Sequence, residues 1–224
     1  SDLITGKRNL AEFQALVTCG GFSYGDVLGG GGGWAKSVLL NLQVRDQFEA
    51  FLHSDRLVLG VCNGCQMLAQ LRELVPGAEH WPRFVRNRSE QFEGRSVLVE
   101  IADSASPWFE GMVGSVLPVA VAHGEGRAEF GSAEDLDALR AAKQLAVRYV
   151  DANYQVANRY PDNPNGAIDG LAGITANNGK VLVMMPHPER VFRSCQNVWQ
   201  HESWGEDGPW MRLFRNARTA LGQP

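Results

Sequence analysis

The 224-residue sequence lacks the features of three large classes of protein. Basic residues are not in excess, because 21 Lys and Arg face 25 Asp and Glu, and the formal net charge of −4 argues against nucleic-acid binding. No apolar run approaches the roughly 20 residues that span a bilayer. Four cysteines and no signal peptide argue against a secreted, disulfide-linked fold. We therefore expect a cytoplasmic protein with neither nucleic acid nor membrane as a partner.

Apolar patterns of strand length and of helix length alternate along the chain, and neither a repeat nor a long linker divides it. They predict one α/β domain over residues 1–224, with a mostly parallel central sheet flanked by helices and a few antiparallel strands. Asn177-Asn178-Gly179 predicts a hairpin turn, and residues 34–51 predict one amphipathic helix. The abrupt start at Ser1, without a methionine, suggests a C-terminal fragment of a longer polypeptide.

The stretch from Leu57 to Leu68 has the pattern of a nucleophile elbow, which is a sharp turn between a strand and a helix. It begins as a short apolar run typical of a buried strand and continues as a good helix former. Gly60 and Gly64 flank Cys62 at two residues on either side, where larger side chains would collide as the backbone turns. Cys62 would also lie at a helix N-terminus, which favours the thiolate.

Cys62 and Cys65 form a C-x-x-C pair, which leaves other interpretations open. Such a pair in an α/β protein can be a thioredoxin-like redox centre, and from this stretch alone that function is as well supported as an acyl-transfer nucleophile. A purely structural, buried cysteine is a third alternative. Zinc is disfavoured because no second C-x-x-C or H-x(3–5)-H follows. If one thiol is the nucleophile, the flanking glycines select Cys62.

A second chemical motif follows a predicted strand near the C-terminus. Two prolines in Pro186-His187-Pro188-Glu189 stiffen the backbone around the histidine, and the carboxylate two residues on can orient its ring. A histidine beside a glutamate is more often structural than catalytic. Together with an elbow cysteine, however, His187 and Glu189 supply the base and the orienting acid of a triad. Both motifs follow predicted strands, where open parallel sheets bind ligands.

Five consecutive glycines, Gly29 to Gly33, imitate a phosphate-binding loop. Gly30 to Ser37 has the pattern G-x-x-x-x-A-K-S, with Ala35 where a P-loop needs the glycine before its lysine. Trp34 would also intrude on the phosphates. We therefore reject nucleotide binding here and expect a flexible loop near the active site.

The segments Gly60–Gln66 and Pro186–Glu189 look like those of the class I, or triad, glutamine amidotransferases. Five further runs resemble one branch of that class, the C-terminal glutaminase domains of the large, single-chain phosphoribosylformylglycinamidine synthases of purine biosynthesis. The resemblance covers nearly the whole chain. It implies a flavodoxin-like sheet whose first strand and helix would precede Ser1. The five runs are Gly20–Asp26, Trp81–Asn87, His123–Gly126, Met184–Arg190 and Trp204–Asp207.

For the site, the resemblance implies that Cys62 attacks the side-chain amide of glutamine, that His187 moves the proton and that Glu189 orients His187. It also implies a role in substrate binding for four residues. The backbone N–H groups near Gly21 and of Asn63 would stabilise the oxyanion. Gln66 and His123 would help to hold glutamine.

The resemblance also implies a partner. Ammonia would pass to an ATP-dependent synthetase domain of the same polypeptide, so that ATP and magnesium belong to that domain, while this chain needs neither a cofactor nor a metal. The chain departs from the family pattern in the glycine run, where larger and acidic residues are expected in place of Gly30 and Gly32. This departure puts the rigidity of that loop in doubt, and with it any signal from the loop to the synthetase. A thioredoxin-like module that uses Cys62 and Cys65 is the alternative function.

Overall fold

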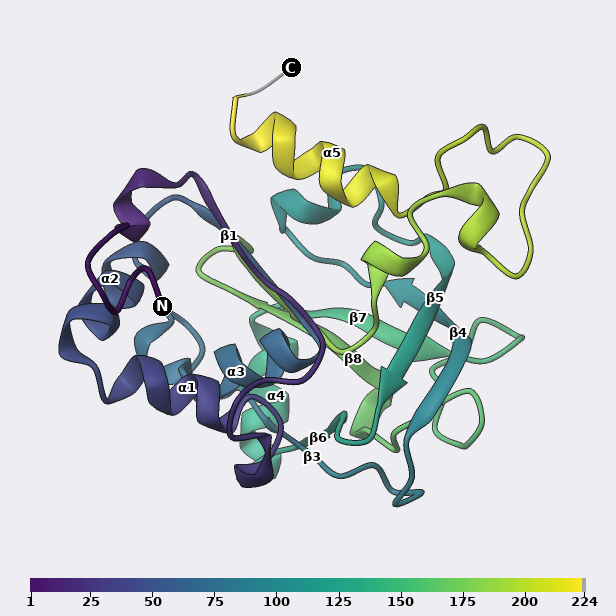
Figure 1. Cartoon of the computed structure of the whole chain (residues 1–224). Helices are drawn as coiled ribbons and strands as arrows, with labels where there is room; N and C mark the ends of the chain where they lie inside the picture. The colour runs from purple at the N-terminus through teal and green to yellow at the C-terminus, as the bar shows by residue number, and fades with distance from the viewer. Residues whose placement is uncertain (223–224) are drawn as a thin grey trace.

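The computed structural model describes residues 1–222. Its main element is one seven-stranded sheet, and a separate two-stranded sheet is formed by β3 (Arg83–Val85) and β6 (Arg127–Glu129). Figure 1 shows the course of the chain through both. In spatial order the seven strands are β1 (Ala15–Thr18), β2 (Leu57–Val61), β9 (Val181–Met184), β8 (Leu171–Ala176), β7 (Leu145–Val150), β4 (Glu93–Ile101) and β5 (Val116–His123).

The α/β class predicted from the sequence is confirmed, but the share of antiparallel pairing is larger than expected. Strands β1, β2 and β9 are parallel, whereas β9–β8, β8–β7, β7–β4 and β4–β5 are all antiparallel. The β8–β9 hairpin turns at Asn177 and Asn178, both with positive φ, as the sequence predicted. Such short connections permit only antiparallel pairing, while β1, β2 and β9 are joined through helices or long crossovers.

In the described part of the chain, five α-helices accompany the sheet: α1 (Gly32–Leu39), α2 (Leu42–Leu52), α3 (Asn63–Gln70), α4 (Ala133–Ala141) and α5 (Met211–Ala220). In Figure 1, α1 and α3 lie toward the bottom of the view and α5 lies at the top. The single helix predicted over residues 34–51 is wrong, because the structure has two helices there. Asn41 ends the first and caps the second, since its side-chain oxygen accepts a hydrogen bond from Val44 N at 3.1 Å.

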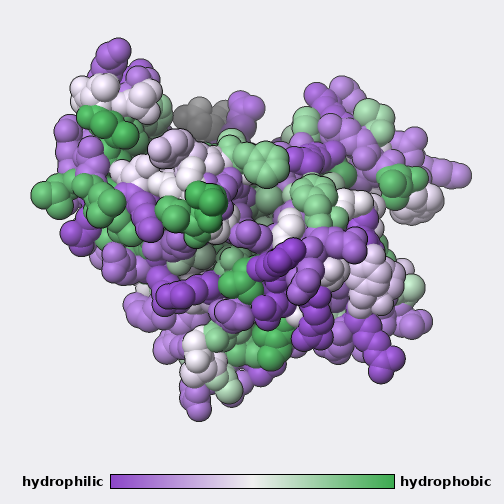
Figure 2. Space-filling view, turned by 60° about the horizontal axis from the view of Figure 1, so that its bottom comes forward, coloured by the Kyte–Doolittle hydropathy of each residue, from purple (hydrophilic) through white to green (hydrophobic). Residues whose placement is uncertain are grey.

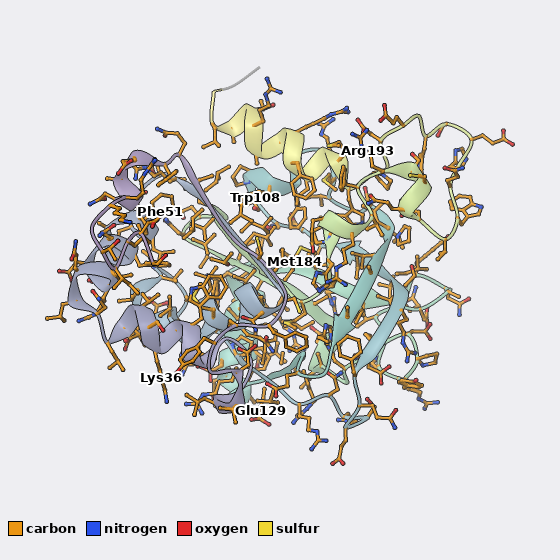
Figure 3. The ribbon with its side chains drawn as sticks, viewed as in Figure 1. Lys36, Phe51, Trp108, Glu129, Met184 and Arg193 are labelled. Carbon is orange, nitrogen blue, oxygen red and sulfur yellow. The ribbon has the colours of Figure 1, made fainter. Side chains whose placement is uncertain are left out.

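The core lies around β2, β8 and β9, in which every residue is buried. Apart from Thr175 of β8, these strands are apolar throughout rather than alternating, as expected of strands covered on both faces. Figure 3 shows Met184, the last residue of β9, in the middle of the molecule. No helix within residues 1–222 is long and apolar enough to cross a bilayer. Because every residue of the parallel strands β2 and β9 is buried, these strands form a rigid base for the residues that follow them.

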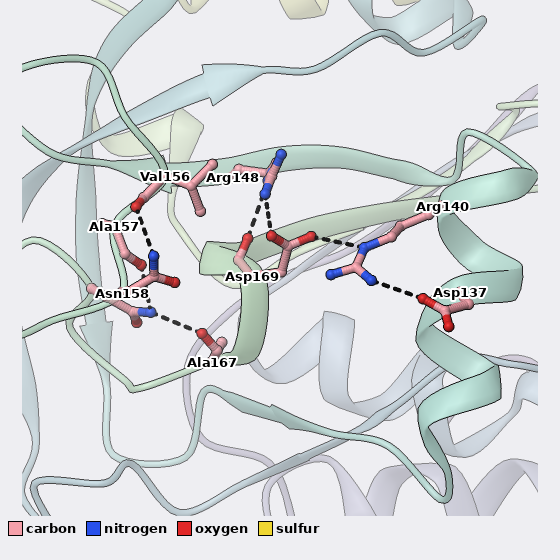
Figure 4. Close-up of polar contacts among 9 residues, drawn as sticks. Asp137, Arg140, Arg148, Val156, Ala157, Asn158, Ala167 and Asp169 are labelled. Carbon is pink, nitrogen blue, oxygen red and sulfur yellow. Dashed lines mark hydrogen bonds and ion pairs between the residues drawn. The ribbon is translucent and has the colours of Figure 1, made fainter.

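A polar network fixes the antiparallel side of the sheet. Asp169, which has a positive φ of 58°, accepts hydrogen bonds from Arg148 of β7 and from Arg140 of α4 (Figure 4). Arg140 also pairs with Asp137 at 2.8 Å. These contacts attach α4 to the sheet, and none of them involves a predicted site residue, so we assign them a structural role.

Candidate active site

Three parallel strands end at the same edge of the sheet and bring three predicted site segments together. Cys62 directly follows β2, His187 lies three residues after β9, and Gly20 lies two residues after β1. A Cβ atom at Gly20 would lie 2.6 Å from His187 Cε1 and 3.2 Å from Cys62 Cβ, so the cysteine and the histidine are neighbours that both lie against the same face of this glycine. The predicted juxtaposition at the carboxyl ends of the strands is thus present.

Cys62 has the backbone of a nucleophile elbow. Its φ of 51° and ψ of −108° are strained for a residue with a side chain, and such strain is typical of functional turns. The strain is held by two hydrogen bonds, from Cys62 N to Met184 O at 2.9 Å and from Gln66 N to Cys62 O at 3.0 Å. The second bond opens α3, so Cys62 is at the helix N-terminus as predicted. Its Sγ lies 3.8 Å from Ala122 O.

Both flanking glycines are required by close packing. A Cβ atom at Gly64 would lie 2.0 Å from the carbonyl oxygen of Thr18 at the end of β1. One at Gly60 would lie 2.7 Å from Leu68 Cδ1 and 3.0 Å from Gly64 O. The predicted need for glycine is confirmed, although at Gly64 the colliding neighbour is β1 rather than the turn itself.

His187 is fixed from both ends. Its backbone N–H donates to Ala120 O of β5 at 2.8 Å, and its Nδ1 lies 2.6 Å from Glu189 Oε1. The side chain of His187 is 1% exposed, whereas that of Glu189 is 42% exposed. Within residues 1–222 the buried Nε2 makes no hydrogen bond, which leaves it available on the side of Cys62. This is the orientation in which Nε2 can exchange a proton with a thiol or a leaving group.

Burial alone would lower the pKa of His187, but the Cys62 thiol and the Glu189 carboxylate outweigh it and raise the pKa to about 9. The ring is therefore protonated at neutral pH when the thiolate is present. Because the folded pKa lies above the unfolded value of 6.5, this charge stabilises the fold fully below pH 6.5. The stabilisation is lost as the pH rises through about 9.

We predict that the wild type loses more unfolding free energy between pH 6.5 and 9 than His187→Gln does, by ~3 kcal/mol at 1.36 kcal/mol per pKa unit. Urea titrations of both proteins across this range measure the difference. Cys62→Ala should flatten the profile in part, since it removes one of the two anionic partners. Parallel profiles for wild type and His187→Gln would refute the ion pair.

Cys65 is more enclosed than Cys62, although both are buried, with 0% and 7% of their surfaces exposed. It is fully buried in the first turns of α3, and burial, followed by the charge of Cys62, raises its pKa well above the usual range. A buried thiol with a raised pKa is a poor nucleophile and a poor partner for thiol–disulfide exchange. This environment favours Cys62 as the single reactive thiol over the redox pair.

The four predicted substrate-binding residues have different surroundings. Among residues 1–222, the backbone N–H groups of Gly21 and Asn63 donate no hydrogen bond, as an oxyanion hole requires. Gln66 lines a cavity of about 830 Å³ that opens beside the site. His123 is instead 4% exposed and lies against Gly126, with Nε2 3.3 Å from Asn165 Nδ2. Burial and then the charge of His187 lower the pKa of His123 to about 3, so its ring is neutral.

Two acidic residues of the site had no assigned role in the sequence prediction. Asp26 accepts hydrogen bonds from Ser23 N and Oγ at 2.7 Å and from Asn63 Nδ2 at 3.0 Å. Burial raises the pKa of Asp26, but these bonds outweigh it and hold the pKa below its usual value. Glu125 Oε2 accepts from Gly30 N at 2.8 Å, while its carbonyl accepts from the Gln66 side chain. The Asp26–Asn63 and Glu125–Gly30 contacts could not be predicted from a sequence motif, because the partners lie 37 and 95 residues apart.

The glycine run is near the site, as predicted, but it is not a flexible loop. Gly31, Gly32 and Gly33 are buried, and the last two form the first turn of α1. A Cβ atom at Gly33 would lie 2.0 Å from Tyr24 O, and one at Gly31 would lie 2.5 Å from Met67 N. At Gly30 it would lie 2.4 Å from Gln66 Oε1. The run therefore permits close packing of α1 on α3 and beside Gln66.

Among residues 1–222, no three His, Cys, Asp or Glu side chains lie close enough together to hold a metal ion. The reactive groups of the candidate site are the thiol of Cys62, the imidazole of His187 and the carboxylate of Glu189. Such a set can perform acyl transfer through a covalent thioester.

Comparison with known families gives one match over nearly the whole chain. The model of the CobB/CobQ-like glutamine amidotransferase domain matches residues 1–219. Among solved structures, a chain of PurLQS from Thermotoga maritima is similar with a TM-score of 0.70 and 23% sequence identity, over 96% of this chain and 82% of that chain. At this identity the similarity establishes the fold and not the substrate.

Two further structures are more distant. A glutamine amidotransferase from Thermotoga maritima has a TM-score of 0.47 and 19% identity, over 82% of this chain and 59% of that chain. The glutaminase domain of Trypanosoma brucei CTPS, solved with bound acivicin, has a TM-score of 0.49 and 13% identity, over 94% of each chain.

Proposed function

The chain belongs to the family of CobB/CobQ-like glutamine amidotransferase domains, and on this basis we propose that it hydrolyses glutamine to glutamate and ammonia at Cys62. The observation that carries the proposal is the placement of a strained elbow cysteine and a buried, Glu189-oriented His187 beside each other, against the same face of Gly20. Family membership supports the substrate class, and the geometry supports the choice of residues.

In the first half of the reaction the Cys62 thiolate attacks the side-chain carbonyl carbon of glutamine, and a C–S bond forms as the carbonyl oxygen becomes an oxyanion. The free N–H groups of Gly21 and Asn63 would stabilise that oxyanion. His187 Nε2 then gives its proton to the departing nitrogen, the C–N bond breaks, and ammonia leaves a γ-glutamyl thioester. In the second half His187 removes a proton from water, which attacks the thioester and releases glutamate and the thiolate.

The destination of the ammonia is a finer proposal. We propose that it passes to an ATP-dependent synthetase domain that amidates formylglycinamide ribonucleotide in purine biosynthesis. The support consists of the five sequence runs that resemble phosphoribosylformylglycinamidine synthases and of the structural similarity to a chain of PurLQS. In this proposal ATP and magnesium act in the synthetase, the enzyme as a whole is a ligase of the cytoplasm, and this chain uses no cofactor of its own.

An affinity label tests the glutaminase proposal. A glutamine-analogue electrophile, such as a chloroketone or acivicin, should modify one thiol per chain, and peptide mapping should place it on Cys62. The expectation rests on the helix N-terminus and on His187 beside Cys62. Excess glutamine should protect this thiol.

The remaining three cysteines are the internal controls for this labelling. Cys65 is buried, whereas Cys19 and Cys195 are exposed and should react only with a general alkylating agent such as iodoacetamide. Equal modification of Cys62 and Cys65, or a reversible disulfide between them, would support the redox alternative instead.

A further inference from the structure

Exposed apolar side chains gather in one short segment of the chain. Within residues 1–222, six of the sixteen large hydrophobic residues that are exposed lie between residues 22 and 42, and we call them the 22–42 patch. Figure 2 shows hydrophobic residues gathered over the side of the molecule that carries α1 and α2. Single exposed apolar residues are ordinary, but a concentration of them marks an interaction site. The patch consists of Phe22, Tyr24, Val27, Leu28, Leu40 and Leu42.

The patch has a concave centre. Tyr24, Val27 and Leu40 line a hollow of about 600 Å³ together with Lys36, the only charged residue in its wall. Within residues 1–222, Lys36 makes no ion pair. Figure 3 shows Lys36 on α1, at the edge of the molecule. An apolar hollow around a single unpaired cation fits a partner that brings an apolar protrusion and a carboxylate.

The patch is continuous with the proposed glutaminase site. Leu28 and Lys36 line both this hollow and the larger cavity that reaches Gln66 and Glu125. The same segment contains Asp26, which holds Asn63 of the proposed oxyanion hole. A partner on the patch would therefore border the cavity that is lined by Gln66, one of the residues proposed to hold glutamine.

The area is sufficient for a specific contact. Phe22 and Tyr24 are almost completely exposed and would bury on the order of 300–400 Å² together. With the four aliphatic side chains the patch exceeds a few hundred Å², the size that soluble monomers rarely exceed. It approaches the ~800 Å² that each partner buries in a standard interface.

We propose that the 22–42 patch is the surface on which the ammonia-accepting synthetase domain docks, an inference that rests on the glutaminase function proposed above. Ammonia that escapes into water is lost as ammonium, so the acceptor must cover the site that releases it. A second copy of this chain fits less well. If the patch paired with itself in a two-fold symmetric contact, neither the patch nor the wall of its hollow would supply a carboxylate to Lys36.

The test uses the intact enzyme that holds both activities and measures glutamate formed per amidated product. Val27→Ser and Leu40→Ser, separately and together, should raise this ratio at least ~3-fold, as expected for loss of part of an interface hot spot. Synthesis driven by ammonium should remain unchanged, because neither side chain belongs to a catalytic centre. Val198→Ser is the matched control, since Val198 is 84% exposed and Val27 is 94% exposed, but Val198 lies outside the patch.

The proposal is overturned if the Val27 and Leu40 variants keep the wild-type ratio, or if Val198→Ser changes it equally. It is also overturned if light scattering shows that these substitutions convert a dimer to monomers without changing the ratio, because the occupant would then be a second copy. Failure of the glutaminase function has a different signature, which is a wild-type enzyme that forms no glutamate from glutamine.

Discussion

Replacement of Cys62 by alanine in the intact enzyme should abolish synthesis driven by glutamine and leave synthesis driven by ammonium salt intact. The nucleophile forms the C–S bond of the thioester on which both half-reactions depend, so its loss should reduce the glutamine-driven rate by a factor on the order of 10⁴ or more. Ammonium bypasses the thioester and meets the synthetase directly. Two steady-state rates for each variant, one with glutamine and one with ammonium at high pH, measure the effect.

The two other triad residues should give a graded series. His187→Ala removes the group that moves the proton in both half-reactions, and a general acid–base is worth on the order of 10²–10⁴ in rate. Glu189→Ala should be milder, because this half-exposed carboxylate only orients and charges the imidazole. Cys195→Ala, an exposed thiol, is the control and should match the wild type in both assays. Loss of both activities in a folded Cys62→Ala enzyme would show that Cys62 does more than release ammonia.

The sequence could indicate the candidate catalytic residues, and the structure brings them together, because their motifs are local. The G-x-C-x-G pattern around Cys62 and the prolines around His187 each encode a backbone shape within a few residues, and the parallel strands before them place both at one edge of the sheet. The apolar run at β2 likewise predicted a strand buried on both faces.

The remaining features depend on contacts between distant parts of the chain. Asp26 and Glu125 act on Asn63 and Gly30, and no spacing within the sequence reveals those partners. The glycine run suggested flexibility because its packing partners, Tyr24 and Met67, become visible only in three dimensions. The break between α1 and α2 depends on one capping side chain, Asn41, within an otherwise continuous helical pattern.

Gly64 provides the strongest test of the elbow as a packed structure. Gly64→Ala should destabilise the fold even though alanine is the better helix former by roughly 0.5–1 kcal/mol and Gly64 lies inside α3. The new Cβ would lie 2.0 Å from Thr18 O, which is backbone of a buried strand and cannot rotate away. Relief requires α3 to move from β1, so the cost should reach the upper part of the range for overpacking, about 3 kcal/mol.

The net loss for Gly64→Ala is therefore about 2 kcal/mol, which lowers Tm by roughly 4–8 °C in a chain of this size. Thermal unfolding of three variants separates packing from the general effect of Gly→Ala. Gly205→Ala should be neutral, because nothing lies within 4 Å of its Cβ position. Gly60→Ala should be intermediate, because its closest neighbour is the movable end of Leu68. If Gly64→Ala were as stable as Gly205→Ala, the close approach of α3 to β1, and with it the strained backbone that presents Cys62, would have to be rejected.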